Sequence, residues 1–140
     1  MRLEGRILKS GKFWAVEVPL LMLFTQGRTR KEAFEMAKDA VEGMVDRKAF
    51  EASVVPADDD RFMIGSNDEK LLLATVLRQQ RAGRGLTVRD VATRLGASSP
   101  TAYARYETGN VNLSLEKFSE LMHAIDSESE AVLNILRKHG

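Results

Sequence analysis

A proline followed by three consecutive aspartates interrupts the sequence near its middle, at residues 56–60. Proline disrupts regular secondary structure, and three adjacent like charges resist burial. Before this point short apolar runs alternate with turn residues, whereas after it the apolar residues recur at helical spacing. The sequence therefore predicts two domains of different class, residues 1–55 and 68–140, joined by an acidic linker region at 56–67.

The beginning of the chain predicts three strands. Residues 2–9 and 12–18 are two apolar-rich runs on either side of Ser10-Gly11, a combination typical of a hairpin with a glycine turn. A third short run, residues 20–25, follows Pro19 and ends before Gln26-Gly27. We expect it to form a third strand of the same sheet.

One helix is expected after these strands. Thr29 and Glu32 have the spacing of a capping box, in which each side chain satisfies an orphan backbone donor. Apolar residues then recur at intervals of three and four up to Val45, so one face of the helix packs on the sheet. Residues 61–65 predict a short returning strand, which makes the order β-β-β-α-β.

The second half predicts helices throughout. Capping residues precede each apolar-periodic run, and glycines follow several of them. We therefore expect an α+β chain whose C-terminal domain is all-α with five helices, the last of them carrying Ala131, Val132, Ile135 and Leu136. The five expected helices begin near Ser66, Thr87, Ser99, Ser114 and Ser127.

Two short helices joined by a tight turn at Gly96 have the dimensions of a helix-turn-helix. Ala92 is small enough to let the helices cross closely, and Val91 and Leu95 anchor the first of them. Gly96 permits the positive φ that a sharp turn needs. The same pattern also fits a helical hairpin with no role in DNA binding.

Charge separates these two interpretations in part. The whole chain has a net charge of only +1, but the window from Arg78 to Arg105 holds six arginines and a single acid, Asp90. Arginine suits phosphate and guanine contacts, and a local cluster favours binding through counterion release. The window predicts DNA binding, with a solvated basic face as the alternative.

Several functional classes are disfavoured by composition. The chain has no cysteine, and its two histidines lie far from any carboxylate cluster, so we expect no disulfide, no metal and no cofactor. The longest apolar run is too short to span a membrane, and the first residues lack the apolar core of a secretory signal. We expect a cytoplasmic protein that does not contact membranes.

The second half resembles the XRE family, the repressor-like helix-turn-helix domains of Cro and phage repressors, over residues 70–126. The likeness is carried by Leu86-Thr87, Val91-Ala92, Leu95-Gly96, Tyr103, Arg105-Tyr106-Glu107-Thr108-Gly109 and Ser114-Leu115-Glu116-Lys117-Phe118. It implies base contacts from the third helix and the turn before it, and phosphate contacts nearby. The implied base contacts are Ser98, Ser99, Thr101, Ala102 and Arg105, and the implied phosphate contacts are Arg81, Arg84, Asn110 and Asn112.

The first half resembles the HicB antitoxin family over residues 3–50. The likeness is carried by Trp14-Ala15-Val16-Glu17-Val18-Pro19 and by the run from Phe24 to Ala33 that leads into the amphipathic helix. It implies a partial ribonuclease H-like fold that masks HicA, a small ribonuclease toxin, while the C-terminal domain represses the operon. The three strands offer only Glu4 and Glu17 as carboxylates, so we expect no catalytic residues in this chain.

Two functions therefore stay open. The chain is either an antitoxin that also represses its operon, or a stand-alone repressor whose first domain serves oligomerisation or ligand sensing. Because one helix-turn-helix buries too little surface to be specific, we expect a homodimer or higher oligomer on operator DNA. Its contact would use the last helix, an edge strand of the first domain, or the apolar segment from Leu20 to Phe24.

Overall fold

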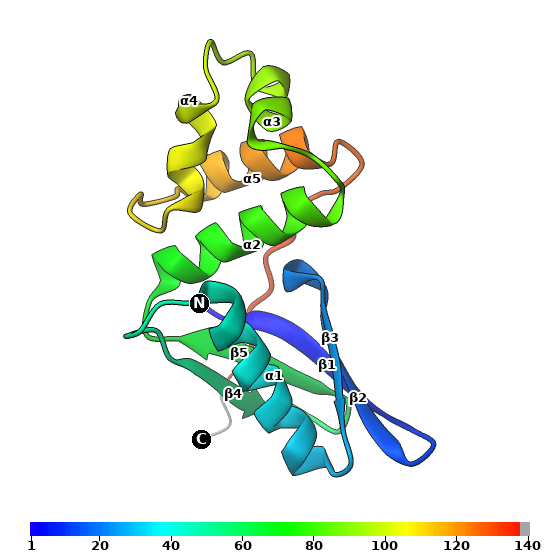
Figure 1. The fold of residues 1–140 in the computed structure, drawn as a ribbon. Coiled ribbons are helices and arrows are strands. Elements are labelled where there is room, and N and C mark those ends of the chain that lie inside the picture. The colour runs from blue at the N-terminus through cyan, green and yellow to red at the C-terminus, as the bar shows by residue number, and fades with distance from the viewer. Residues whose placement is uncertain (138–140) are drawn as a thin grey trace.

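Five antiparallel strands form one sheet in the N-terminal half of the molecule (Figure 1). The computed structural model describes residues 1–137 and confirms the α+β class. The sheet has the order β3-β2-β1-β5-β4. Its strands are β1 (Leu3–Ser10), β2 (Phe13–Val18), β3 (Leu23–Gly27), β4 (Ala52–Pro56) and β5 (Arg61–Ser66).

The predicted hairpin is formed by β1 and β2, which meet at a two-residue turn with Gly11 at a φ of +60°. The predicted third strand begins later than expected. Pro19 presets a helical φ, so the chain first makes a 3-10 turn, η1 (Pro19–Leu21). Met22 then takes a left-handed conformation, and β3 starts at Leu23.

Helix α1 (Arg30–Val45) covers one face of the sheet, as its apolar periodicity predicted. The Thr29 hydroxyl caps it by accepting a hydrogen bond of 3.0 Å from the backbone N–H of Glu32. The helix approaches β3 so closely that a Cβ at Gly27 would lie 2.8 Å from the Cα of Ala33. Among residues 1–137 no helix covers the other face of the sheet, which leaves exposed side chains along β1, β2 and β3.

The predicted returning strand is β5, and it lies beside β1 inside the sheet. Strand β4, which the sequence did not predict, pairs with β5 along the edge. The three aspartates form the turn between these two strands, where the Arg61 guanidinium binds the Asp58 carboxylate and lowers the pKa of that carboxyl to about 2. The chain leaves the sheet after Ser66, and the first C-terminal helix begins at Glu69.

The C-terminal half is helical, but the last predicted helix is not formed. Residues 130–137 have no regular secondary structure, and the side chains of Val132 and Ile135 are 83% and 94% exposed. A short helix without tertiary packing is marginal in water, which explains the difference. The last three residues of the predicted domain, 138–140, lie outside the described residues. The elements present are α2 (Glu69–Gly83), α3 (Val88–Arg94), α4 (Thr101–Ala104), η2 (Arg105–Glu107) and α5 (Leu115–Ile125).

Helix α2 belongs to both halves of the molecule. Leu72 and Val76 pack into the core beneath the sheet, while Leu77 packs into the core of the helical half. The side-chain amides of Gln79 and Gln80 donate hydrogen bonds to backbone carbonyls of η1. These contacts fix the helical half against the sheet.

Candidate nucleic-acid interface

Helices α3 and α4 form the predicted helix-turn-helix. Thr87 and Asp90 begin α3 with a complete capping box, because each side chain accepts a hydrogen bond from the other residue's backbone N–H, at 3.0 and 2.8 Å. After α3 the chain turns at Gly96, whose φ is +72°. The predicted glycine turn is therefore confirmed, and it directs residues 97–100 toward the start of α4.

The scaffold side chains lie where the sequence placed them. Val91 and Ala92 on α3 are buried, and Tyr103 on α4 packs against them in one core with Leu121 of α5. Tyr106 is partly buried against the same core. The inner face of α4 is thereby occupied, and its outer face is free to meet a ligand.

An ion pair joins the end of this unit to α2. Arg81 donates two hydrogen bonds to the Glu107 carboxylate, from Nε at 2.7 Å and from its second terminal nitrogen at 2.9 Å, and the two side chains are only 15% and 9% exposed. The remaining terminal nitrogen donates to the carbonyl of Leu86. The carboxylate raises the pKa of Arg81, so its charge is fixed at all ordinary pH values.

Tyr103 lies beside this ion pair. Its hydroxyl is buried and finds no hydrogen-bond partner among residues 1–137. Burial, together with the adjacent Glu107 carboxylate, raises the pKa of Tyr103 far above its usual range. The phenol is therefore neutral and acts as a packing group in the core.

Most of the arginine cluster is engaged within the protein. Arg84 pairs with Asp126 at 2.8 Å, and Arg94 donates to two carbonyls at the C-terminal end of α5. Arg78 donates to the carbonyl of Met44, and Arg105 stacks on the Tyr106 ring at 4.9 Å while donating to its hydroxyl. A large part of the positive charge counted in the sequence therefore connects helices to each other and to the sheet domain.

Arg89 is the one arginine of the window from residue 78 to residue 105 that has no partner among residues 1–137. It is exposed on α3, and among residues 1–137 it makes no hydrogen bond or ion pair. Arg89 is one of the six arginines in the basic window, but the family resemblance implied no DNA contact for it. Its position two residues after the Thr87 cap, away from the buried Val91 and Ala92, was the signal that identifies it as outward-facing.

The side chains expected to contact bases are all exposed. They lie in the turn after α3, on α4 and at the start of η2. Asn110 and Asn112 are also exposed, on the loop between η2 and α5, whereas Arg81 lies inward in the ion pair. The exposed side chains of the turn, α4 and the start of η2 are Ser98, Ser99, Thr101, Ala102 and Arg105.

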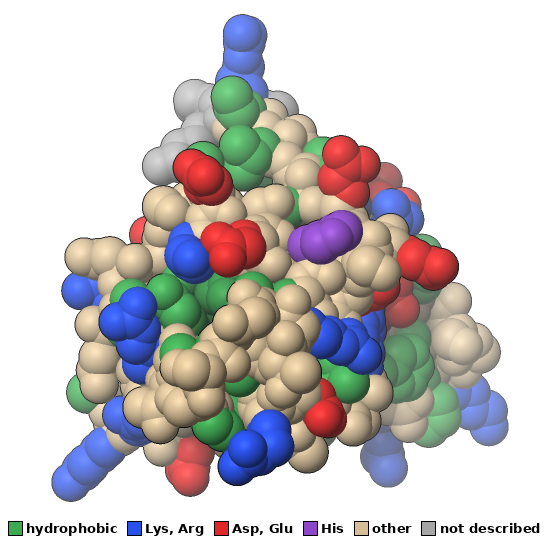
Figure 2. Space-filling model, turned by 90° about the horizontal axis from the view of Figure 1, so that it is seen from above, with side chains coloured by type: hydrophobic (Ala, Val, Ile, Leu, Met, Phe, Trp, Pro, Cys, Tyr) green, Lys and Arg blue, Asp and Glu red, His purple; other side chains and the backbone are tan. Residues whose placement is uncertain are grey.

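This end of the molecule carries mixed charge. Figure 2 looks down on it and shows Lys and Arg side chains projecting at the rim, carboxylates among them, and a centre made mainly of uncharged side chains and backbone. Short uncharged side chains can approach base edges closely, and basic side chains around them reach phosphates. The arrangement suits a major-groove contact.

Residues 72–133 match the model of a helix-turn-helix domain family, a stretch that runs from α2 past the end of α5. No curated protein matches the chain. Across residues 1–137 no helix is long and apolar enough to cross a membrane, and no cluster of three potential metal ligands is present. The family match shows a helix-turn-helix domain of the DNA-binding type, which follows the five-stranded sheet along the chain.

Proposed function

We propose that this chain is an antitoxin of the HicA/HicB type. In this proposal the helix-turn-helix domain represses the operon, and the sheet domain masks a small ribonuclease toxin. The observation that supports it is a second complete domain attached to the DNA-binding one. The sheet and α1 enclose a core that Leu72 and Val76 of α2 complete, and they contribute no residue to the turn or to α4.

The order of elements supports the toxin-binding half of the proposal. A hairpin, a third strand and an amphipathic helix follow one another as in the HicB-like stretch of the sequence, residues 3–50. The partial ribonuclease H-like fold and the HicA-like partner belong to this proposal. Masking a toxin requires a stable binding surface, and a five-stranded sheet backed by α1 is a stable element that fits this role.

For DNA, we assign the base contacts to the exposed surface of the turn and α4, with Arg105 at its end. Arg89 is added as a phosphate contact, because its guanidinium is exposed and has no partner within residues 1–137. Asn110 and Asn112 remain in the proposal as backbone contacts beside α5. Arg84 can contact phosphate only if its ion pair with Asp126 breaks, and Arg81 can do so only if its ion pair with Glu107 breaks.

A stand-alone repressor is the second candidate, and one observation favours it. The face of the sheet opposite α1 exposes large apolar side chains, which fits a first domain that serves oligomerisation. Ligand sensing is less suited to this face, because its groove holds only about 120 Å³ and is open to solvent, whereas ligand pockets usually hold roughly 300 to 1,000 Å³.

Separation of the two activities tests the proposal. Arg105→Ala should weaken binding to DNA from the chain's own upstream region while leaving neutralisation of a co-expressed HicA-like toxin intact, because the two surfaces lie on different domains. Arg28→Ala removes the same charge from an exposed site before α1, outside the helix-turn-helix, and serves as the control for DNA binding. Loss of both activities in a folded Arg105→Ala protein would contradict the division of labour, and failure to neutralise any such toxin would favour the stand-alone repressor.

A further inference from the structure

Exposed large apolar side chains concentrate in two places on this chain. The first group, which we call the sheet patch, lies on β1, β2 and β3, and Phe24 in it is 70% exposed. The second group, the C-terminal segment, follows α5, and Ile135 in it is 94% exposed. The sheet patch comprises Leu8, Phe13 and Phe24, and the C-terminal segment comprises Val132, Leu133, Ile135 and Leu136.

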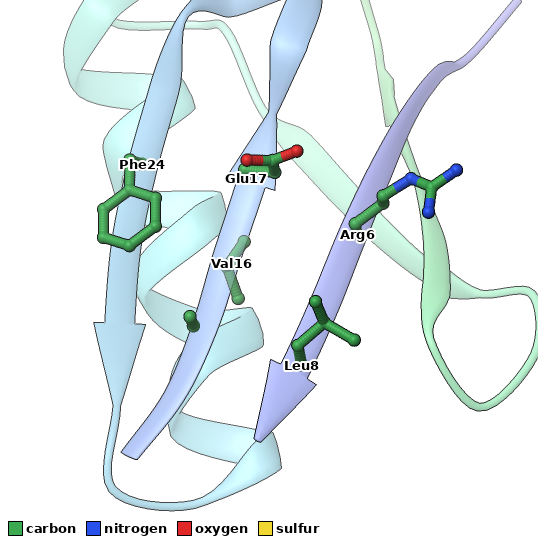
Figure 3. Close-up of a pocket in the computed structure, with 6 residues that line it drawn as sticks. Arg6, Leu8, Val16, Glu17 and Phe24 are labelled. Atoms are coloured by element: carbon green, nitrogen blue, oxygen red, sulfur yellow. The ribbon is translucent and has the colours of Figure 1, made fainter. Parts of the chain in front are cut away.

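The sheet patch contains a shallow groove between neighbouring strands (Figure 3). Leu8 lies opposite Ala15 in the β1–β2 pair, and Phe24 lies opposite Glu17 in the β2–β3 pair. The groove between these side chains has a volume of about 120 Å³, several times the ~30 Å³ that a water molecule occupies in the liquid. Its lining is mainly apolar, with Arg6 and Glu17 at one end, so it suits an aliphatic side chain better than a polar ligand.

The other half of the same sheet face differs. Strand β4 ends at Pro56, and the turn that follows it carries three aspartates. Proline and charge are common devices that protect a sheet edge from unwanted pairing. Strand β3 carries neither, since its five residues include no proline and no charged side chain. Among residues 1–137, the exposed large apolar side chains of the sheet lie on β1, β2 and β3, and none lies on β4 or β5.

The C-terminal segment runs on the same side of the molecule as the sheet patch. In Figure 1 the chain leaves α5 and passes behind the sheet, on the side away from α1. Asn134 is the only polar residue between Ala131 and Leu136, and Glu128 and Glu130 come just before this stretch. Neither apolar group covers the other within one chain, because both remain exposed.

We propose that the C-terminal segment of one copy packs into the sheet patch of a second copy, and that the second copy returns the contact. Each contact covers two apolar groups that a single chain leaves in water, which is favourable. The arrangement is isologous, so one interface contains two equal contacts. It ties the DNA-binding domain of one copy to the sheet domain of the other and brings two α4 surfaces into a single assembly, as recognition of two half-sites requires.

Sedimentation of the full-length protein tests this pairing without DNA or toxin, so its result is independent of the proposed function. Phe24→Glu and Ile135→Glu each place a charge in the contact, and each variant keeps its fold because the wild-type side chain is 70% or 94% exposed, respectively. If each charge weakens the affinity of each of the two equal contacts about tenfold, the monomer–dimer Kd rises about 100-fold. Met36→Glu alters an exposed apolar side chain on α1, outside the contact, and leaves the Kd unchanged.

Cysteine cross-linking distinguishes a second copy from the same chain, because the protein has no cysteine of its own. We mix one variant carrying only Leu8→Cys with another carrying only Ile135→Cys and add a short bis-maleimide linker. The proposal expects a cross-linked heterodimer, and it expects none when Ser53→Cys on β4 replaces Leu8→Cys. A monomeric wild type, unchanged dimerisation of both charge variants, or cross-linking only within a single chain carrying both cysteines would overturn it.

Discussion

The ion pair between Arg81 and Glu107 gives the sharpest prediction about how the helix-turn-helix is held. Arg81→Met leaves the Glu107 carboxylate, 9% exposed, without its cation. Removing one partner of a buried ion pair costs about 3 to 5 kcal/mol of unfolding free energy. We expect about 3 kcal/mol, the lower end, because the Arg81 side chain keeps 15% of its surface exposed.

The loss is measurable by urea unfolding and by thermal melting followed by circular dichroism. At roughly 4 °C per kcal/mol for a chain of this size, about 3 kcal/mol lowers the melting temperature by about 12 °C. The double variant Arg81→Met/Glu107→Gln should be less destabilised than the sum of the single variants, because neither change then leaves an unpaired charge.

Arg84→Met provides the control, since it breaks an arginine–carboxylate pair that has a single hydrogen bond and is two to three times as exposed, at 29% and 27% for Arg84 and Asp126. Its loss should stay below about 1 kcal/mol. Equal losses at the two sites, or additive effects of Arg81→Met and Glu107→Gln, would refute the reasoning that burial makes the Arg81 pair a structural clamp. Such a result would return Arg81 to the set of free phosphate contacts.

Three further predictions follow from local geometry. Gly27→Ala should cost about 2 kcal/mol in urea unfolding, because its Cβ would press on the backbone of Ala33; an unchanged midpoint would show that α1 can shift outward. Backbone N–H donors lower the pKa values of the Glu42 and Asp90 carboxyl groups. The stability that these two groups contribute is present above pH ~4, where the carboxyls of the unfolded chain ionise, and is lost as the pH falls through the pKa values of the folded protein. NMR titration of the two carboxyls with midpoints at ordinary values would contradict this. Arg89→Ala should reduce the slope of log Kd for DNA against log salt by about 1 without lowering the melting temperature, and an unchanged slope would remove Arg89 from the phosphate contacts.

The helices could be predicted where capping and periodicity agreed. Thr29, Thr87 and Ser114 each cap the helix that the sequence placed after them, because their hydroxyls accept a backbone N–H three residues later. The last predicted helix is not formed in residues 130–137, because its apolar side chains pack against nothing within one chain. Strand β4 was missed because its five residues lie at a sheet edge and lack a clear alternation of buried and exposed positions.

The candidate interface was only partly accessible to sequence reasoning. The glycine turn and the scaffold residues Val91 and Ala92 followed from residue type and spacing, and the structure confirms them. The contacts of the arginines could not be predicted from the sequence, because a charge count does not show whether a guanidinium contacts a carboxylate or solvent. Glu107 and Asp126 lie 26 and 42 residues from their arginine partners, beyond the reach of local patterns. The individual base contacts stay predictions.

Repression by this chain depends on sequence-specific DNA binding, which can be measured without the toxin. Fluorescence anisotropy of the full-length protein would compare DNA from the chain's own upstream region with a shuffled duplex of equal length and composition, between about 50 and about 200 mM salt. We predict at least about a thousandfold preference for the upstream DNA, and an affinity that falls steeply with salt on both duplexes. Equal affinity for the two duplexes, or an affinity that does not change with salt, would contradict the account.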